Sequence, residues 1–116
     1  LPTYLSMCDA FLLTQTNDPS SWSRTTGKLP GYLAIGRPIL ASNVGTASEL
    51  LPDEMLISYD GEWDLGYPQR LAERIRRLYE DPSRIERGAA LIPLSKQFDY
   101  DEVARDAADV VLQVAD

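Results

Sequence analysis

The chain has 116 residues, 44% of them hydrophobic, and is long enough to bury one modest core, so a single domain over 1–116 is predicted. Its formal charge of −7 at pH 7 argues against a nucleic-acid backbone or an anionic membrane as main partner, because both select a basic face. A single cysteine, Cys8, excludes an internal disulfide, and the chain lacks histidine and any long apolar run. We therefore expect a cytoplasmic setting and no bound metal.

The first third of the chain predicts a short helix, a strand and a long loop. Residues 2–7 have the pattern of a helix, and the apolar run 10–13 predicts a strand buried on both faces. Residues 14–27 are polar, with a turn expected over 17–21, and loops of this length are usually functional or disordered. Trp22 is either a stacking platform for a sugar or base or a plug that holds the loop on its own domain, and we favour the plug.

Residues 28–42 are the most informative stretch. The pattern predicts a helix over 29–35, with Pro30 in its first turn, where a missing N–H costs little. Gly36 can end that helix in the left-handed conformation, and Pro38 prevents its continuation, so 39–41 is expected to start a strand. The loop before the helix then lies at the carboxyl ends of the strands, where open α/β folds bind their ligands.

A second loop over 42–46, a brief helical turn over 49–51 capped by Thr46 or Ser48, and a third strand over 55–59 are predicted next. The loop that follows carries Asp60, Glu62 and Asp64; spaced acids of this kind suggest a metal, but we expect them to be solvated.

The last part of the chain predicts three helices. The first, over 68–79, is amphipathic and pairs Glu73 with Arg77 one turn apart, and the dipeptide 81–82 breaks it. The second starts at 83 and ends or kinks near Pro93, and the last runs over 100–114 with an apolar face. Arginines are expected on solvated surfaces, namely Arg37, Arg70, Arg74, Arg76, Arg77, Arg84 and Arg87.

This alternation predicts an α/β domain, a parallel sheet with helices on its faces. About three strands can be counted, whereas a doubly wound unit usually has ~5 to 6. Since the chain also starts without a methionine, we expect a partial doubly wound, Rossmann-like sheet whose other strands lie in sequence outside it.

Short motifs follow one another in a definite order along nearly the whole chain. They are Tyr4-Leu5, Cys8-Asp9-Ala10-Phe11-Leu12-Leu13, Lys28-Leu29, Tyr32-Leu33-Ala34, Gly36, Pro38-Ile39-Leu40-Ala41-Ser42, Gly45, Glu49-Leu50-Leu51, Leu71-Ala72, Ile75, Leu78, Asp81-Pro82 and Phe98-Asp99-Tyr100. In this order they resemble the carboxyl-terminal, donor-binding domain of GT-B fold glycosyltransferases, most closely family 4.

The resemblance implies a retaining glycosyltransferase that moves a hexose from a nucleotide diphosphate sugar to an acceptor hydroxyl, with no cofactor beyond the donor. It implies an amino-terminal GT-B domain of the same chain as partner, with the acceptor site and the usual basic residues before Leu1. The piece alone is then inactive, its catalytic residues are unknown, and a membrane is involved only through segments outside it.

The resemblance also implies a donor site at the loop and at the start of the following helix, where free N–H groups and the helix dipole favour an anion. The candidate substrate-binding residues are Ser23, Arg24, Thr25, Thr26, Gly27, Lys28 and Gly31. Backbone amides of 25–27 would face the diphosphate, with Lys28 as the nearby cation. The family pattern has two glutamates where this chain has Ser23 and Gly31, so either a divergent member holds its donor through Ser23, Arg24 and the amides, or tight donor binding is lost.

Two other functions stay open. The missing acids at Ser23 and Gly31 suggest a degenerate, non-catalytic Rossmann-like module kept for folding or assembly. The strand and helix alternation also permits a flavodoxin-like or receiver-like signalling domain. We rank that last, because Asp9 precedes its strand instead of following it.

Overall fold

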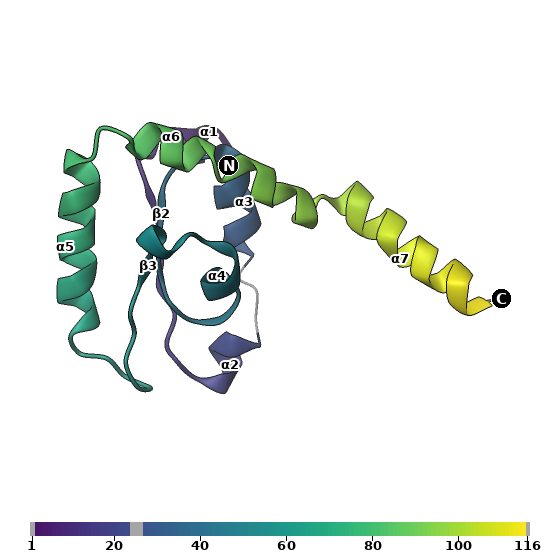
Figure 1. The fold of residues 1–116 in the computed structure, drawn as a ribbon, viewed down its shortest axis with the longest axis horizontal. Coiled ribbons are helices and arrows are strands. Elements are labelled where there is room, and N and C mark those ends of the chain that lie inside the picture. The colour runs from purple at the N-terminus through teal and green to yellow at the C-terminus, as the bar shows by residue number, and fades with distance from the viewer. Residues whose placement is uncertain (1, 24–26, 116) are drawn as a thin grey trace.

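The computed structural model describes residues 2–23 and 27–115 and has a three-stranded, all-parallel sheet with flanking helices (Figure 1). The strands are β1 (Phe11–Leu13), β2 (Ile39–Ser42) and β3 (Leu56–Ile57), in the spatial order β1-β2-β3. Leu12 lies beside Leu40, and Ala41 lies beside Leu56. The predicted α/β class and the parallel sheet are confirmed.

The larger core lies on one face of the sheet. Here α1 (Pro2–Ser6), α3 (Lys28–Ile35), α4 (Gly45–Leu50) and the 3-10 helix η2 (Ile92–Phe98) surround buried residues of the strands. Leu33 of α3 and Ile39 of β2 are completely buried, and the ring of Tyr32 stacks on that of Phe11 with their centroids 4.2 Å apart. Of the apolar positions predicted for the helix over 29–35, Leu29, Tyr32 and Leu33 therefore lie in this core, whereas Ala34 is exposed.

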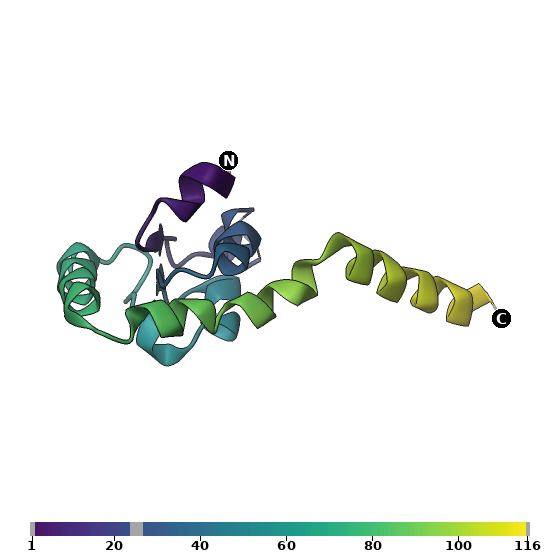
Figure 2. The same cartoon turned by 90° about the horizontal axis from the view of Figure 1, so that it is seen from above.

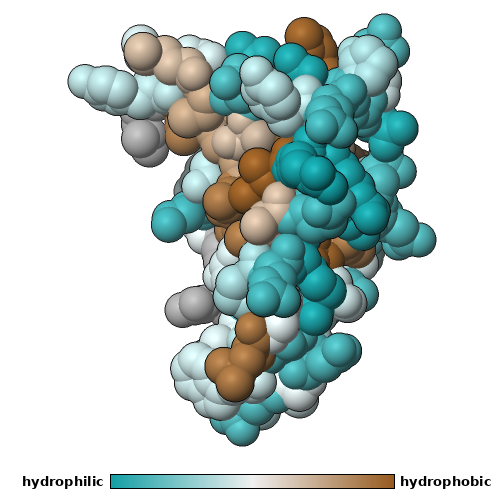
Figure 3. Space-filling model, turned by 90° about the vertical axis from the view of Figure 1, so that its left-hand side faces the viewer, coloured by the Kyte–Doolittle hydropathy of each residue, from teal (hydrophilic) through white to brown (hydrophobic). Residues whose placement is uncertain are grey.

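The opposite face of the sheet is covered only in part. Helix α5 (Tyr67–Glu80) packs over β2 and β3, where Leu40, Ile57 and Tyr67 form a smaller core. Leu12 of β1 points to the same side but is 47% exposed, so the prediction that this strand is buried on both faces is wrong. Figure 3 shows the α5 side, with hydrophobic surface left open beside the hydrophilic side chains. Leu12 is exposed because α5 covers β2 and β3 and no described helix covers β1 on this side of the sheet.

The turn between α3 and β2 forms as predicted. Gly36 has a φ of 79° and donates its N–H to the carbonyl of Tyr32 at 3.3 Å, which closes the helix in the left-handed conformation. The chain then packs against α6 (Arg84–Ala89), where a Cβ on Gly88 would stand 2.6 Å from the carbonyl oxygen of Gly36. Glycine at position 88 thus permits this close approach.

Several elements differ from their predicted form. The turn expected over 17–21 contains a short helix, α2 (Pro19–Trp22), because Asp18 caps its start. Helix α4 begins at Gly45, earlier than predicted, and neither Thr46 nor Ser48 is its N-cap, since Val44 holds that position. The third strand, predicted over 55–59, is limited to Leu56–Ile57; Met55 belongs instead to the 3-10 helix η1 (Asp53–Met55).

The end of the chain leaves the body of the molecule. Pro93 neither ends nor kinks a long helix; it lies in the first turn of η2, where proline is tolerated. Helix α7 (Tyr100–Ala115) follows and projects away from the sheet, so that every one of its residues is exposed (Figures 1 and 2). Its apolar face was predicted from the sequence, but within the described residues no element covers it.

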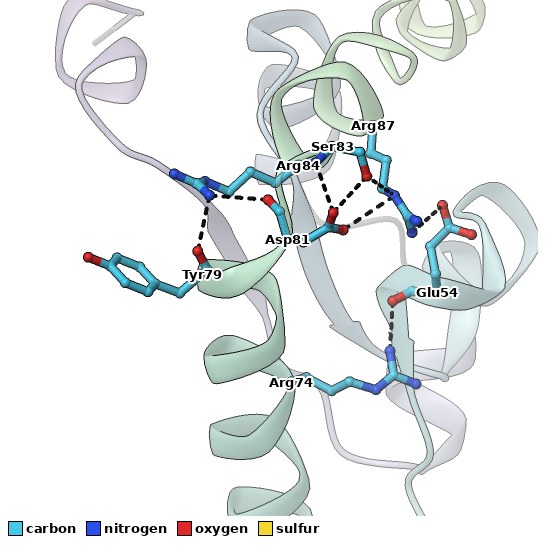
Figure 4. A network of polar contacts seen from close by, with 7 residues as sticks. All are labelled: Glu54, Arg74, Tyr79, Asp81, Ser83, Arg84 and Arg87. Carbon is cyan, nitrogen blue, oxygen red and sulfur yellow. Dashed lines mark hydrogen bonds and ion pairs between the residues drawn. The ribbon is translucent and has the colours of Figure 1, made fainter.

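Some arginines join elements instead of lying on solvated faces. Arg74 of α5 donates to the carbonyl of Glu54 at 2.7 Å, while Arg87 of α6 lies 3.4 Å from the carboxylate of Glu54 (Figure 4). Arg84 donates to the carbonyls of Tyr79 and Asp81, which fixes the turn after α5. The prediction holds for Arg76 and Arg77, which pair with Glu73 on the outside of α5.

Arg37 also differs from its predicted surface position. It is only partly exposed and donates from Nη2 to the carbonyl of Ser6 at 3.2 Å. Its Nε is buried and has no hydrogen-bond partner. Arg37 thereby links α1 to the turn before β2.

Candidate functional site

The candidate site is formed by the loops that follow the strands. Thr14 and Gln15 come directly after β1, Asn43 and Val44 lead from β2 into α4, and Ser58 follows β3. Because parallel strands end at one edge of the sheet, these loops lie together, and the starts of α2, α3 and α4 lie at the same end (Figure 1).

Gln15 is a buried polar side chain that lies two residues after the end of β1. It is 8% exposed, and its backbone N–H donates to the Oγ of Ser42 at 2.9 Å, which ties the end of β1 to the end of β2. The Nε2 of its carboxamide is buried without a hydrogen-bond partner. A buried donor without a partner lowers the stability of the fold by about 1–3 kcal/mol, so this end of the sheet contains a costly unsatisfied N–H group.

Asp18 organises the loop that follows. Its carboxylate accepts from the hydroxyl of Thr16 at 2.6 Å and from the backbone N–H of Ser21 at 2.9 Å. The Thr16 hydroxyl, followed by the Ser21 amide, holds the pKa of Asp18 below its ordinary value, because both stabilise the charged form. The first turn of α2 is thus fixed by an ionised cap.

Gly45 lets α2 and α4 approach closely. Its φ is +63°, and a Cβ there would lie 2.7 Å from the carbonyl oxygen of Ser21 and 3.7 Å from the Oε1 of Gln15. A side chain at this position would push the two helices apart. Gln15, Ser42 and Gly45 were not singled out from the sequence; the available signal was their position directly after β1 and β2.

The predicted donor-binding residues lie in different surroundings, and only some of them face open space. Lys28 is the exposed first residue of α3, and Gly27, its N-cap, has no side-chain capping bond and open space where a Cβ would stand. The hydroxyl of Ser23 donates to the carbonyls of Pro19 and Ser20 within α2. Gly31 lies one turn into α3, where a Cβ would stand 3.9 Å from Leu5 of α1. Three further predicted residues, Arg24, Thr25 and Thr26, lie outside the described residues.

Trp22 does not act as the predicted plug. Its side chain is 55% exposed, and its indole N–H donates to the Oδ1 of Asn17 at 2.6 Å. The hydrogen bond holds the ring at the rim of its own loop, because α2 turns it away from the core. The alternative, an aromatic surface on which a planar or apolar ligand face can stack, fits this exposure.

The acidic loop after β3 has a structural role at Asp64. Its carboxylate accepts from the backbone N–H groups of Asp60 at 2.7 Å and of Gly66 at 2.9 Å, and it pairs with Arg70. The Asp60 amide and Arg70 keep the pKa of Asp64 below its ordinary value. The expectation that these acids are simply solvated is wrong for Asp64. Among the described residues, no cluster of three acidic or cysteine side chains could hold a metal ion.

Helices within residues 2–23 and 27–115 are too short or too polar to cross a membrane. Comparison of the chain with known protein families, with curated proteins and with solved structures finds no match.

Proposed function

We propose that this chain is the donor-binding part of a retaining glycosyltransferase of the GT-B fold and holds a nucleotide diphosphate sugar at the carboxyl ends of its strands. The observation that carries the proposal is the start of α3, where the exposed Lys28 follows a glycine cap surrounded by open space. The sequence resemblance to family 4 implies this same position for the donor. The finer identity of the sheet, the carboxyl-terminal half of a doubly wound domain, is part of the proposal.

The physical basis is the recognition of an anion. The first N–H groups of α3 have no intrahelical acceptor, and the helix dipole places partial positive charge at this end. A lysine there is unfavourable in the absence of an anion, whereas a diphosphate would be stabilised by the amides, the dipole and the ammonium group together. Glycine at position 27 leaves the approach free of a side chain.

The surroundings supply a further group for a donor. Trp22 offers an exposed ring near the same end of the sheet. Ser23 and Gly31 provide no carboxylate, so the charge-assisted bonds that the family's glutamates make to the sugar and ribose are missing. We therefore expect weak donor binding, with the diphosphate contributing most of the affinity.

The second candidate function is a degenerate, non-catalytic module. It is favoured by the placement of Ser23, whose hydroxyl is used within α2, and of Gly31, which packs beside α1. In that case the open space at Gly27 is a remnant of a donor site, and the domain contributes to folding or assembly alone.

Calorimetric titration with uridine and guanosine diphosphates separates the two. We expect micromolar to millimolar binding of one of them, and a loss of about fivefold or more in affinity for Lys28→Ala. The control is Lys96→Ala, which removes the same charge from the exposed η2 segment and should leave the affinity unchanged.

If neither nucleotide binds, the donor site is refuted and the degenerate, non-catalytic module is supported. The chain alone should also show no sugar transfer from a nucleotide sugar to an acceptor, because a GT-B active site is built between two domains. Turnover by the isolated chain would contradict that part of the proposal.

A further inference from the structure

We propose that the chain has a second ligand site, between α5, η1 and α6, which binds a small phosphate monoester with an apolar organic part. Its apolar part lies toward the amino ends of the strands, since it is lined by Pro38 and Leu40 at the start of β2 and by Met55 before β3. The proposed donor site is the start of α3, and none of the described residues that line this second site belongs to α3 or to the loop before it, so the two proposals rest on different residues.

Two adjoining hollows make up the space. The first has a volume of about 300 Å³ and lies between η1, the end of α5 and α6. The second has a volume of about 410 Å³ and continues along α5 past Ile57 and Ser58. Arg74 and Arg77 line both hollows and stand at their junction. Each hollow is within the size range of small-molecule sites.

The first hollow has an apolar floor. It is lined by Pro38 before β2, Leu40 of β2, Met55 of η1 and Leu78 of α5. Leu40 and Met55 are each 3% exposed and are fixed by the cores around them. A preformed apolar surface of this kind favours a ligand with an apolar group that leaves water on binding.

The rim of this hollow carries guanidinium donors that the protein itself does not use. Arg74 donates from Nη1 to the carbonyl of Glu54, and Arg77 pairs through Nε with Glu73. Within the described residues, the Arg74 guanidinium makes no other hydrogen bond, so its Nε and Nη2 donate to no protein acceptor, and Glu73 is the partner of Arg77. Both side chains line the two hollows, and planar guanidinium groups bind phosphate oxygens in pairs.

Carboxylates at the site are already engaged. Glu54 lies against Arg87, and Asp81 accepts from the N–H and the hydroxyl of Ser83 and pairs with Arg87 (Figure 4). The Ser83 hydroxyl and amide hold the pKa of Asp81 below its ordinary value, so it stays charged and bound. The first hollow is therefore lined by three arginines, Arg74, Arg77 and Arg87, against these two acids, and this excess of one positive charge favours an incoming anion.

The matched test uses Arg76 and Arg77. Both pair with Glu73, and their side chains are 69% and 68% exposed, but only Arg77 lines the hollows. Arg77→Ala and Arg76→Ala therefore remove the same charge and a similar helix pair, and circular dichroism should show that both variants fold alike.

The probe is phenyl phosphate, titrated by calorimetry beside inorganic phosphate and phenol. We expect a dissociation constant of about 1 mM or lower for phenyl phosphate, at least tenfold weaker binding of inorganic phosphate, and no binding of phenol. Arg77→Ala should weaken the binding of phenyl phosphate about fivefold or more, while Arg76→Ala should change it by less than about twofold. Lys28→Ala should leave it unchanged, because that residue belongs to the donor site.

Equal losses in the two arginine variants would overturn the proposal, since they would indicate a long-range effect of charge. Equal affinity for phenyl phosphate and inorganic phosphate would overturn the apolar part of the site. Loss of binding in Lys28→Ala would assign the ligand to the carboxyl ends of the strands and refute a second site.

Discussion

The hydroxyl of Tyr67 lies 3.3 Å from the Oγ1 of Thr14, so the first residue of α5 contacts the first residue after β1 across 53 positions of sequence. Tyr67 is 3% exposed, and its ring lies 5.2 Å from that of Tyr59. This contact anchors α5 over the sheet near the carboxyl ends of the strands.

Replacement of Tyr67 by phenylalanine tests this anchor. The change removes one hydrogen bond and leaves the Thr14 hydroxyl without that partner, so the free energy of unfolding at pH 8 should fall by about 0.5–1.5 kcal/mol. Urea unfolding measures the difference, and Tyr79→Phe is the control because Tyr79 is 79% exposed. A loss of the same size in both variants would mean that the contact with Thr14 contributes nothing.

The same variant predicts a dependence on alkaline pH. Burial raises the pKa of Tyr67 above its ordinary value of 10.0, so its contribution to stability is complete below pH 10 and is lost as the pH rises through the folded-state value. Tyr67→Phe lacks this loss, and the stability gap between the wild type and the variant should narrow between pH 8 and pH 11. A gap that stays constant would show that Tyr67 ionises equally in both states.

Gly36 and Gly61 form a matched pair for backbone strain. Both have a positive φ, of 79° and 69°, but a Cβ on Gly36 would stand 2.7 Å from Ile92, whereas Gly61 has open space. Gly61→Ala should cost about 1–2 kcal/mol of unfolding free energy through its backbone alone. Gly36→Ala should cost roughly 2–4 kcal/mol, because displacement of Ile92 adds to the same backbone cost. Equal losses of unfolding free energy in the two variants would show that Ile92 and η2 move aside at no cost.

Acid destabilisation should depend on Asp64. The backbone amide of Asp60 and the Arg70 guanidinium lower its pKa, so its contribution is present above about pH 3.8 and is lost as the pH falls through the lower, folded-state value. Asp64→Asn should therefore be less stable than the wild type at pH 6 and lose less stability between pH 5 and pH 2. Glu62→Gln, a change at an exposed residue of the same loop, is the control. Parallel pH profiles for Asp64→Asn and the wild type would contradict the role of this carboxylate.

The exposure of α7 gives a prediction about stability. Val111 is 65% exposed, so Val111→Ser should change the free energy of unfolding by no more than about 0.5 kcal/mol. Leu33→Ala, in the centre of the larger core, should cost about 2–5 kcal/mol. A loss above 1 kcal/mol for Val111→Ser, measured by urea unfolding of the chain, would show that α7 packs against the body.

The order of the elements could be predicted because it depends on local chemistry. Gly36 and Pro38 fix the turn between α3 and β2 through their own backbone preferences, and the apolar spacing of residues 67–80 fixes α5. Caps were harder to place: Asp18 starts an unpredicted helix, and Val44 stands where a hydroxyl residue was expected. Short elements have little propensity of their own, so their contacts decide their bounds.

For the candidate site, the sequence predicted where it lies in the fold but not the contacts of its side chains. A loop at the carboxyl ends of the strands follows from the alternation of elements, and Lys28 is at the start of its helix as expected. The buried amide of Gln15 and the hydroxyl contacts of Ser23 were not predictable, because they depend on how α2 and α4 meet.

The sequence by itself determined that strands and helices alternate and where the main turns lie, because glycine, proline and apolar periodicity act over a few residues. The tertiary structure alone decided that Leu12 is exposed, that α7 stands free, and that Arg74 and Arg87 meet at Glu54. These outcomes depend on which helix covers which strand, and that choice is made by contacts between residues far apart in the chain.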